Sequence, residues 1–322
     1  MEPPPNVSPQ TDESKPPARW RRVLRIVISA ALLVVLFVSI DWSKVPGYVE
    51  RLTPAVTVGV IAIWAVQLAI SAWKWQWALR IHGLRYTYRF LSRVLWIGFF
   101  LNNFLPTSIG GDTYRVYRTL PAAPPKSRAI SAVILERVVG FAALLALGFL
   151  GALALYSTNT LARAYVLFGA AGAVVAIALL ALVGPRILRS TKLAPVTDNL
   201  RSICAAGAEW VPLIALSLLF HVMAVFVLHL LFHSLGAALS LQQAALIAAA
   251  AGLATIVPFS INGLGIVEAT IAGTAVAVGV SYEAGLVVAV LMRVLLLPLT
   301  LAAGLLYAFE PRHHYTNVRS PG

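Results

Sequence analysis

Long apolar runs separated by short polar segments dominate this chain, as expected of helices that cross a membrane. A helix needs about 20 mainly apolar residues to span the hydrocarbon core of a bilayer. Runs of about this length lie approximately at residues 23–40, 55–72, 133–156, 164–183, 211–232 and 284–309. The pattern predicts an all-α integral membrane protein that folds as a polytopic helical bundle.

Two further apolar segments, residues 94–111 and 243–280, are interrupted by the same short motif. Pro106–Gly111 and Pro258–Gly263 both have the pattern Pro-x-Ser-Ile-x-Gly. A broken helix in hydrocarbon must be covered by protein or face a polar cavity, because unpaired peptide groups are costly there. Paired interrupted segments in two halves of a chain indicate a transporter site between inverted repeats. We therefore expect an inverted-repeat core with two re-entrant, interrupted hairpins.

The basic residues predict the orientation of these segments. Lysine and arginine accumulate in cytoplasmic loops, and basic segments lie on both sides of the first break. If residues 94–111 crossed the membrane, one basic segment would lie outside, so we expect this hairpin to return to the cytoplasm. The second hairpin then enters from the outer side. Both termini of this multi-pass protein are expected in the cytoplasm, with the chain in the inner (plasma) membrane.

Composition narrows the class of protein further. The chain is 59% hydrophobic and 11% charged, which excludes a soluble domain of this size. We interpret its net charge of +13 as a topology signal and expect no nucleic-acid partner. A single cysteine excludes an internal disulfide. We divide the chain into a disordered cytoplasmic tail (1–18), a transmembrane domain (19–310) and a second cytoplasmic tail (311–322).

The residues around the breaks resemble a known family. Phe100–Asp112, Leu135–Arg137 and Pro258–Glu268 are similar to the lysylphosphatidylglycerol synthase transmembrane-region family, also called the flippase-like domain family. The resemblance covers roughly residues 20–310 and implies a membrane domain that moves lipids between leaflets. Asn262 stands where the family pattern has a glycine. In its best-known form the domain is fused to an aminoacyl-transferase; because this chain ends soon after the last expected span, we expect no lysinylation activity.

Arg137 and Arg293 are the leading substrate-binding candidates, since each lies inside an apolar segment. A charged side chain near the bilayer centre costs about 2.5–3.5 kcal/mol or more, which makes it a functional-site candidate. A guanidinium binds a lipid phosphate through two parallel hydrogen bonds. The alternative is an internal ion pair with Asp112, Glu136 or Glu268 that only fixes helix packing. These three carboxylates are candidates for the same site.

Polar and glycine residues of the breaks complete the candidate site. The N-terminus of a helix that begins at a break suits an anionic headgroup, although serine, asparagine or Asp112 could simply cap the helix there. The asparagines before the first break could instead bond to neighbouring helices. The candidates are Asn102, Asn103, Ser108, Gly110, Gly111, Ser260, Asn262 and Gly263. We expect no metal or other cofactor, because His221 and His229 lack a third ligand nearby.

These observations favour a translocase that moves an anionic phospholipid or isoprenoid-linked lipid between leaflets. Asp112, Glu136 and Arg137 could instead form the pocket of a lipid-modifying transferase, although no metal-ligand cluster, nucleotide loop or Ser/His/Asp set is visible. A third possibility is a non-transporting scaffold for a separate lipid-modifying enzyme, and a homodimer stays open. An intramembrane aspartyl protease is excluded, because Ile109 replaces the first glycine of Gly-x-Gly-Asp and no second aspartate lies in an expected span.

Overall fold

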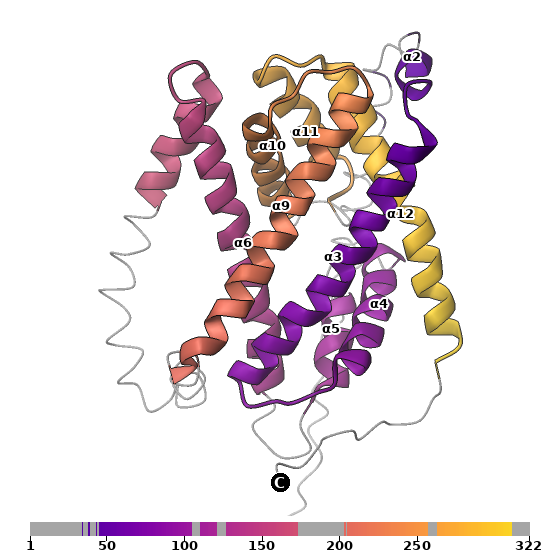
Figure 1. Ribbon diagram of the computed structural model, residues 1–322, viewed down its shortest axis with the longest axis vertical. Coiled ribbons are helices and arrows are strands. Elements are labelled where there is room, and N and C mark those ends of the chain that lie inside the picture. Colours follow the sequence, from indigo (N-terminus) through magenta and orange to yellow (C-terminus); the bar gives the residue numbers. More distant parts are fainter. Residues whose placement is uncertain are drawn as a thin grey trace, which may run out of the picture.

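A computed structural model describes residues 34, 38, 43, 45–104, 110–120, 127–172, 203, 205–256 and 263–310. Every regular element within these residues is helical (Figure 1). Among these residues, four helices are long and apolar enough to cross a membrane. They are α3 (Pro54–Ile81), α6 (Ser127–Ala154), α9 (Trp210–Ser234) with the 3-10 turn η2 (Gly207–Glu209) before it, and α12 (Tyr282–Ala308). The prediction of a polytopic helical membrane protein is confirmed.

Helix length supports this assignment, because the 28 residues of α3 extend about 42 Å at 1.5 Å per residue, beyond a hydrocarbon core of about 30 Å. Two other expected spans are described only in part. Residues 23–40 lie outside the described chain apart from residues 34 and 38, and the expected span at 164–183 is described as a helix over residues 160–172.

Helix α3 continues well past its expected end at residue 72 and includes the sequence Trp73-Lys74-Trp75-Gln76-Trp77. In the sequence these alternating tryptophans are typical of an interfacial belt, but the burial of Trp75 contradicts that interpretation for this residue. The Trp75 ring is fully buried and Lys74 is 3% exposed, whereas Trp73 is 51% exposed. Alternate positions on a helix point to nearly opposite sides, so one side of this segment enters the core while the other stays outside.

Two shorter helices, α4 (Tyr88–Phe104) and α5 (Gly110–Arg118), flank the first break and fold back on each other. The Tyr86 hydroxyl, just before α4, donates a hydrogen bond of 3.1 Å to the Thr119 carbonyl oxygen, just after α5. The pair therefore starts and finishes at the same end of the bundle. The break itself, with Pro106 and Ser108, falls in residues 105–109, outside the described chain.

The second break lies between α10 (Leu241–Ala254) and α11 (Ile266–Ala277). A side-chain amide from the start of α10, Gln243 Nε2, donates to the carbonyl oxygen of Val278, just past α11, at 2.9 Å. This pair also returns to its starting end. Its arms extend only about 21 and 18 Å, less than the hydrocarbon thickness of about 30 Å. Pro258, Ser260 and Asn262 lie outside the described residues.

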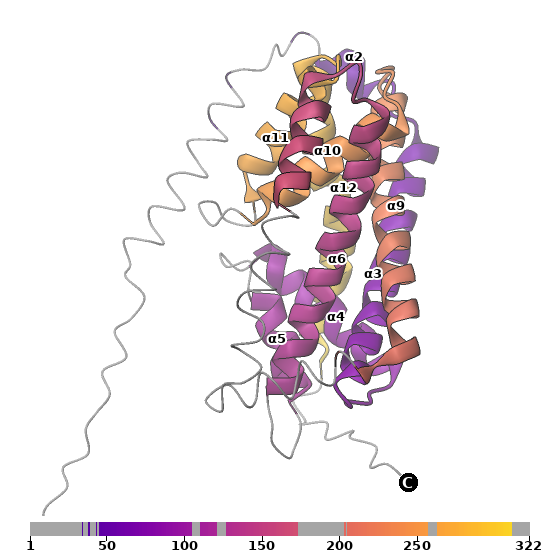
Figure 2. The same ribbon diagram turned by 90° about the vertical axis from the view of Figure 1, so that its left-hand side faces the viewer.

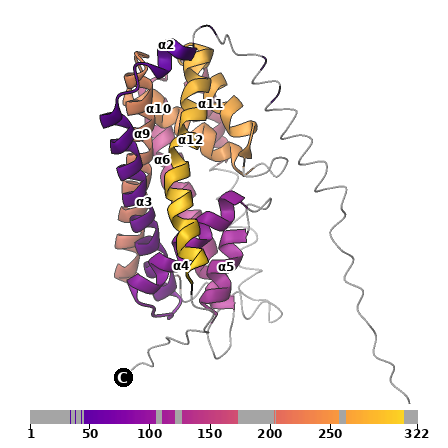
Figure 3. The same cartoon turned by 90° about the vertical axis from the view of Figure 1, so that its right-hand side faces the viewer.

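The two helix pairs occupy opposite ends of the bundle, as Figures 2 and 3 both show. The α10–α11 pair lies near the short helix α2 (Val45–Val49), where Arg51 donates to the Leu235 carbonyl oxygen at the end of α9. The α4–α5 pair lies at the other end, where Tyr114 donates to Glu310 beyond α12. Their positions relative to a bilayer, and the inverted repeat, stay predictions.

Candidate functional site

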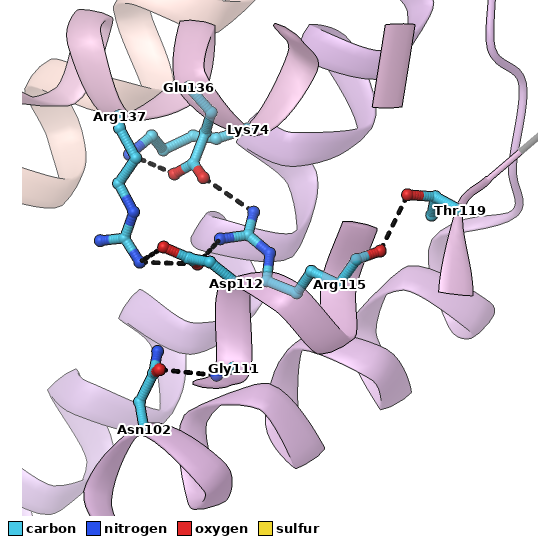
Figure 4. Close-up of polar contacts among 8 residues, drawn as sticks. All are labelled: Lys74, Asn102, Gly111, Asp112, Arg115, Thr119, Glu136 and Arg137. Carbon is cyan, nitrogen blue, oxygen red and sulfur yellow. Dashed lines mark hydrogen bonds and ion pairs between the residues drawn. The ribbon is translucent and has the colours of Figure 1, made fainter. Parts of the chain in front are cut away.

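Five charged side chains from three helices form one cluster beside the first break (Figure 4). Its centre is Glu136 on α6, whose side chain is 5% exposed. Glu136 Oε1 lies 3.2 Å from Lys74 Nζ on α3, and Glu136 Oε2 accepts a hydrogen bond of 2.7 Å from Arg115 Nη2 on α5. One buried carboxylate thus ties three helices together through two cations.

Asp112, in the first turn of α5, extends the cluster outward. It accepts a hydrogen bond of 3.2 Å from Arg115 Nη1 and two of 2.9 and 3.0 Å from Arg137 Nη2. The cluster therefore runs Lys74–Glu136–Arg115–Asp112–Arg137 and contains three positive and two negative charges. Its members differ in access, since the Arg137 side chain is 49% exposed and that of Arg115 only 5%.

Two aromatic rings support the buried cations. The Arg115 guanidinium carbon lies 4.4 Å from the centre of the fully buried Trp75 ring, and Lys74 Nζ lies 4.8 Å from the centre of the Phe220 ring on α9. A cation over an aromatic face is attracted by the ring quadrupole. These contacts help to hold Lys74 and Arg115 in place.

The start of α5 is packed closely against α4. Asn102 Oδ1 on α4 accepts a 2.8 Å hydrogen bond from the Gly111 backbone N–H, which satisfies one of the unpaired N–H groups of the first turn. A Cβ atom on Gly111 would overlap the Gly98 carbonyl oxygen and would lie 2.7 Å from Asn102 Cγ. Gly111 is therefore required for this contact, and α5 begins one residue earlier, at Gly110.

Sequence reasoning left the roles of Asp112 and of the asparagines open, and the contacts show how each side chain is engaged. The described contacts of the Asp112 carboxylate are with two guanidinium groups, so it is an ion-pair partner. Its place in the first turn also favours a negative charge. Asn102 bonds to the adjoining helix of the same hairpin, while Asn103 Nδ2 donates 2.9 Å to the Phe99 carbonyl oxygen in its own helix.

A second charged pair lies beside the other break. Arg293 Nε on α12 donates a hydrogen bond of 2.7 Å to Glu268 Oε1 on α11, as the ion-pair alternative predicted. Glu268 Oε2 also accepts from the Gly265 N–H at 2.7 Å, which fastens the first turn of α11. Gly265 and Gly263 have φ angles of +83° and +71°, a left-handed backbone that glycine adopts without strain. Glu268 is 4% exposed and so needs this partner.

A cavity of about 380 Å³ opens beside the Glu268–Arg293 pair. Its walls come from α3, α4, α9, α11 and α12, together with Thr255 after α10. Phe99, five residues before the end of α4, and Val267, at the start of α11, both line it, so both helix pairs reach this cavity. Phe220 lines the cavity as well, and its ring also supports Lys74. One aromatic side chain is therefore shared by the charged cluster and the cavity.

Sequence analysis missed Lys74 and Arg115 as members of the site. In the sequence alone, Lys74 looks like part of an interfacial belt of tryptophans, and Arg115 looks like part of the basic cytoplasmic segment after the first break. Two signals were available: Lys74 continues the helical run from Pro54, and Arg115 follows Asp112 by three residues, a spacing that brings side chains together on a helix. Among the described residues, no group of three or more His, Cys, Asp or Glu could hold a metal ion.

Comparison with known proteins bears on these residues. A family model described as the lysylphosphatidylglycerol synthase TM region matches residues 22–304. No curated protein and no solved structure gives a significant match. The matched region contains both breaks, the five-residue charged cluster and the Glu268–Arg293 pair.

Proposed function

This chain belongs to the lysylphosphatidylglycerol synthase TM-region family, and we propose on that basis that it is a lipid translocase. Its substrate is an anionic phospholipid or an isoprenoid-linked lipid, which it moves between the leaflets of the cell inner (plasma) membrane. The observation that carries the proposal is the charged cluster, because its exposed end is Arg137 and its overall charge is positive.

The buried and the exposed parts of the cluster have different tasks in this proposal. Lys74, Glu136 and Arg115 are nearly inaccessible and hold three helices in register. Arg137 engages Asp112 through Nη2 alone among the described residues, which leaves Nε and Nη1 of its guanidinium for a phosphate. Charge-assisted hydrogen bonds of this kind are about twice as strong as neutral ones. A phosphate would thus bind beside Asp112 or in its place.

Arg293 supplies a second binding position near the other helix pair. In the proposal, the headgroup passes from Arg137 to Arg293 across the region where Phe220 lies, as the two helix pairs take turns in opening. Glu268 keeps Arg293 oriented between cycles. The end that carries Arg115, Arg118 and Arg128 faces the cytoplasm, following the positive-inside bias.

A lipid-modifying transferase is the second candidate, since the cluster contains two carboxylates. A general base needs a lone pair that can reach the proton it removes. Both oxygens of Glu136 and both of Asp112 are engaged by cations, so neither carboxylate is poised for that task. This arrangement supports binding more than proton transfer. A transferase would leave a covalently altered lipid, which mass spectrometry of membranes with and without the protein would detect.

The test of translocation uses proteoliposomes that contain the full chain and a fluorescent phosphatidylglycerol, with dithionite reporting the label in the outer leaflet. Arg137→Ala should slow translocation roughly 10- to 150-fold, because a hydrogen bond to a charged group contributes about 1.5–3 kcal/mol. Arg137→Lys should lie between the alanine variant and wild type, since it keeps the charge without the guanidinium fork.

Arg163→Ala is the matched control, because Arg163 is exposed at the end of the bundle opposite the cluster. Its rate should equal that of wild type. Equal rates for wild type and Arg137→Ala would remove the proposed role of the cluster. Retention of the cellular phenotype by Arg137→Ala, together with its loss on altering surface loops, would instead favour a non-transporting scaffold.

A further inference from the structure

The turn between α3 and α4 carries arginines that have no carboxylate partner. Figure 1 shows this turn at the end of the bundle where α9 begins. The chain has no aspartate or glutamate from residue 51 to residue 111. Five arginines lie in or beside the turn: Arg80, Arg85, Arg89, Arg93 and Arg128. Within the described part of the chain, none of the five forms an ion pair.

The acidic residues at this end of the bundle do not neutralise these arginines. Asp112 and Glu136 are engaged by the cations of the charged cluster, and Glu310 pairs with Arg118 at 2.6 Å. Glu209, in the 3-10 turn before α9, forms no ion pair with any described residue. The α3–α4 turn therefore holds an excess of positive charge that an anion from outside the protein can neutralise.

The turn is fixed in place by the helices around it. Gln76 Nε2 on α3 donates a hydrogen bond of 2.8 Å to the Tyr86 carbonyl oxygen. From the other side, Arg128 Nη1 on α6 lies 3.7 Å from the position that a Cβ on Gly83 would occupy. The arginines therefore stand on a surface whose backbone is held by α3 and lies against α6.

The start of α4 adds to the positive potential of the turn. Arg89 and Arg93 lie in the first two turns of α4, four residues apart and so on one face of the helix. The first turn of a helix carries a partial positive charge, and here it contains no acidic residue. Arg93 Nε is buried and has no hydrogen-bond partner among the described residues. The helix start and the two guanidinium groups favour an anion at the same place.

Exposed aromatic side chains beside the turn indicate that this anion comes from a membrane. Trp73 on α3 is 51% exposed and Tyr88 at the start of α4 is 37% exposed, with their ring centres 6.5 Å apart in an edge-to-face arrangement. The Tyr88 hydroxyl donates a hydrogen bond of 3.1 Å to the Ala69 carbonyl oxygen. Exposed tryptophan and tyrosine are typical of the boundary between hydrocarbon and headgroups. Arg89, the residue after Tyr88, therefore lies at the depth of lipid phosphates.

We propose that the α3–α4 turn is a docking surface for anionic phospholipids of the leaflet at this end of the bundle. Arg85 and Arg89, which are both exposed, hold the phosphate groups, and the acyl chains lie along Trp73 and Tyr88. The surface retains lipids beside the protein and does not move them. It is separate from the charged cluster and does not depend on the proposed translocation.

Native mass spectrometry of the full chain in a neutral detergent counts bound lipids as dioleoyl phosphatidylglycerol or dioleoyl phosphatidylcholine is added. Wild type should bind phosphatidylglycerol about ten-fold or more tightly than phosphatidylcholine, whose headgroup has no net charge. Arg85→Gln and Arg89→Gln should each weaken phosphatidylglycerol binding about five-fold, and the double variant about 25-fold. Equal binding of the two lipids by wild type would overturn the proposal, as would unchanged phosphatidylglycerol binding by the double variant.

Three controls test the position, the charge and the source of the anion. Arg163→Gln removes an exposed arginine at the opposite end of the bundle and should leave binding unchanged, whereas a five-fold loss there would overturn the proposed position. Arg85→Lys with Arg89→Lys keeps both charges and should stay within about three-fold of wild type. A loss as large as that of the glutamine double variant would overturn the electrostatic basis. An excess of ammonium phosphate should not displace the lipid, and displacement would identify a free anion as the occupant instead.

The outcomes separate this inference from the proposed function. Arg137→Ala should retain phosphatidylglycerol at the turn, although the proposed function expects it to slow translocation. Absence of translocation by wild type would refute the translocase and leave the docking surface. Binding that Arg137→Ala abolishes, and that the Arg85→Gln, Arg89→Gln double variant leaves intact, would assign the lipid to the charged cluster and refute the docking surface.

Discussion

Glu136→Gln removes the carboxylate from the centre of the charged cluster and tests whether that cluster holds the bundle together. Glutamine keeps the size of the side chain, so the change leaves Lys74 and Arg115 buried with no carboxylate between them. Removing one partner of a buried ion pair is destabilising by about 3–5 kcal/mol, because the remaining charge stays desolvated. At about 2–4 °C per kcal/mol, the melting temperature should fall by roughly 6–20 °C.

The assay heats the purified protein in nanodiscs to a series of temperatures and then uses size-exclusion chromatography to measure the fraction that stays folded. Glu50→Gln is the matched control, because Glu50 is exposed and its removal should leave the melting temperature almost unchanged. Adding Lys74→Met to Glu136→Gln should recover part of the loss, since one of the two buried cations disappears. The reasoning fails if Glu136→Gln melts at the same temperature as Glu50→Gln, or if the double variant is less stable than Glu136→Gln alone.

Two further changes probe the packing and the ionisation of this end of the bundle. Gly111→Ala should destabilise the protein by about 1–3 kcal/mol, because the added Cβ would displace the Gly98 carbonyl oxygen. The control is Gly59→Ala, which has open space around the added Cβ and should be neutral or stabilising in the same melting assay. His82, just beyond α3, has its pKa lowered by burial and, to a smaller extent, by the Arg128 charge. The unfolded chain therefore binds a proton at His82 more readily than the folded chain does, so the melting temperature should fall as pH drops from about 8 to about 5, with the loss beginning near pH 6.5. The His82→Gln variant should show a smaller fall. A pH dependence identical in His82→Gln would contradict the assignment, as would equal melting temperatures for the two glycine variants.

Apolar periodicity was sufficient to locate most of the described helices. The expected run at residues 211–232 corresponds to α9, Trp210–Ser234, and the run at 284–309 corresponds to α12, Tyr282–Ala308. Bilayer thickness sets a minimum length for such segments, so their presence was easier to predict than their ends, and α6 begins at Ser127 where the run began at residue 133. The end of α3 was misjudged because Lys74 and Gln76 looked like the start of a polar segment. Both are buried by other helices, and nothing local in the sequence records that packing.

The sequence predicted one of the charged pairings but not the other. The pairing of Glu268 with Arg293 was among the expected alternatives, because both are charged residues within the apolar segments that follow the second break. The pairing of Glu136 was harder to predict, since its partners Lys74 and Arg115 come from two other helices. Partner choice there depends on which helix faces lie together, a property of the whole bundle. Ser108, Ser260 and Asn262 lie outside the described residues, and their roles stay predictions.

Because α4 and α5 return to the end from which they started, they do not change the direction of the helices that follow. Arg128, at the start of α6, reaches within 3.7 Å of where a Cβ on Gly83 would lie, just after α3. The helices before and after this folded-back pair are therefore neighbours in space and run in opposite directions, just as they would if joined by a short loop. Because α4 and α5 lead away from this end and back again, the chain enters α6 at the same end of the bundle at which it left α3. The direction of α6 and of the helices after it is therefore set by α3 and does not depend on the α4–α5 pair, whose side chains serve the charged cluster instead.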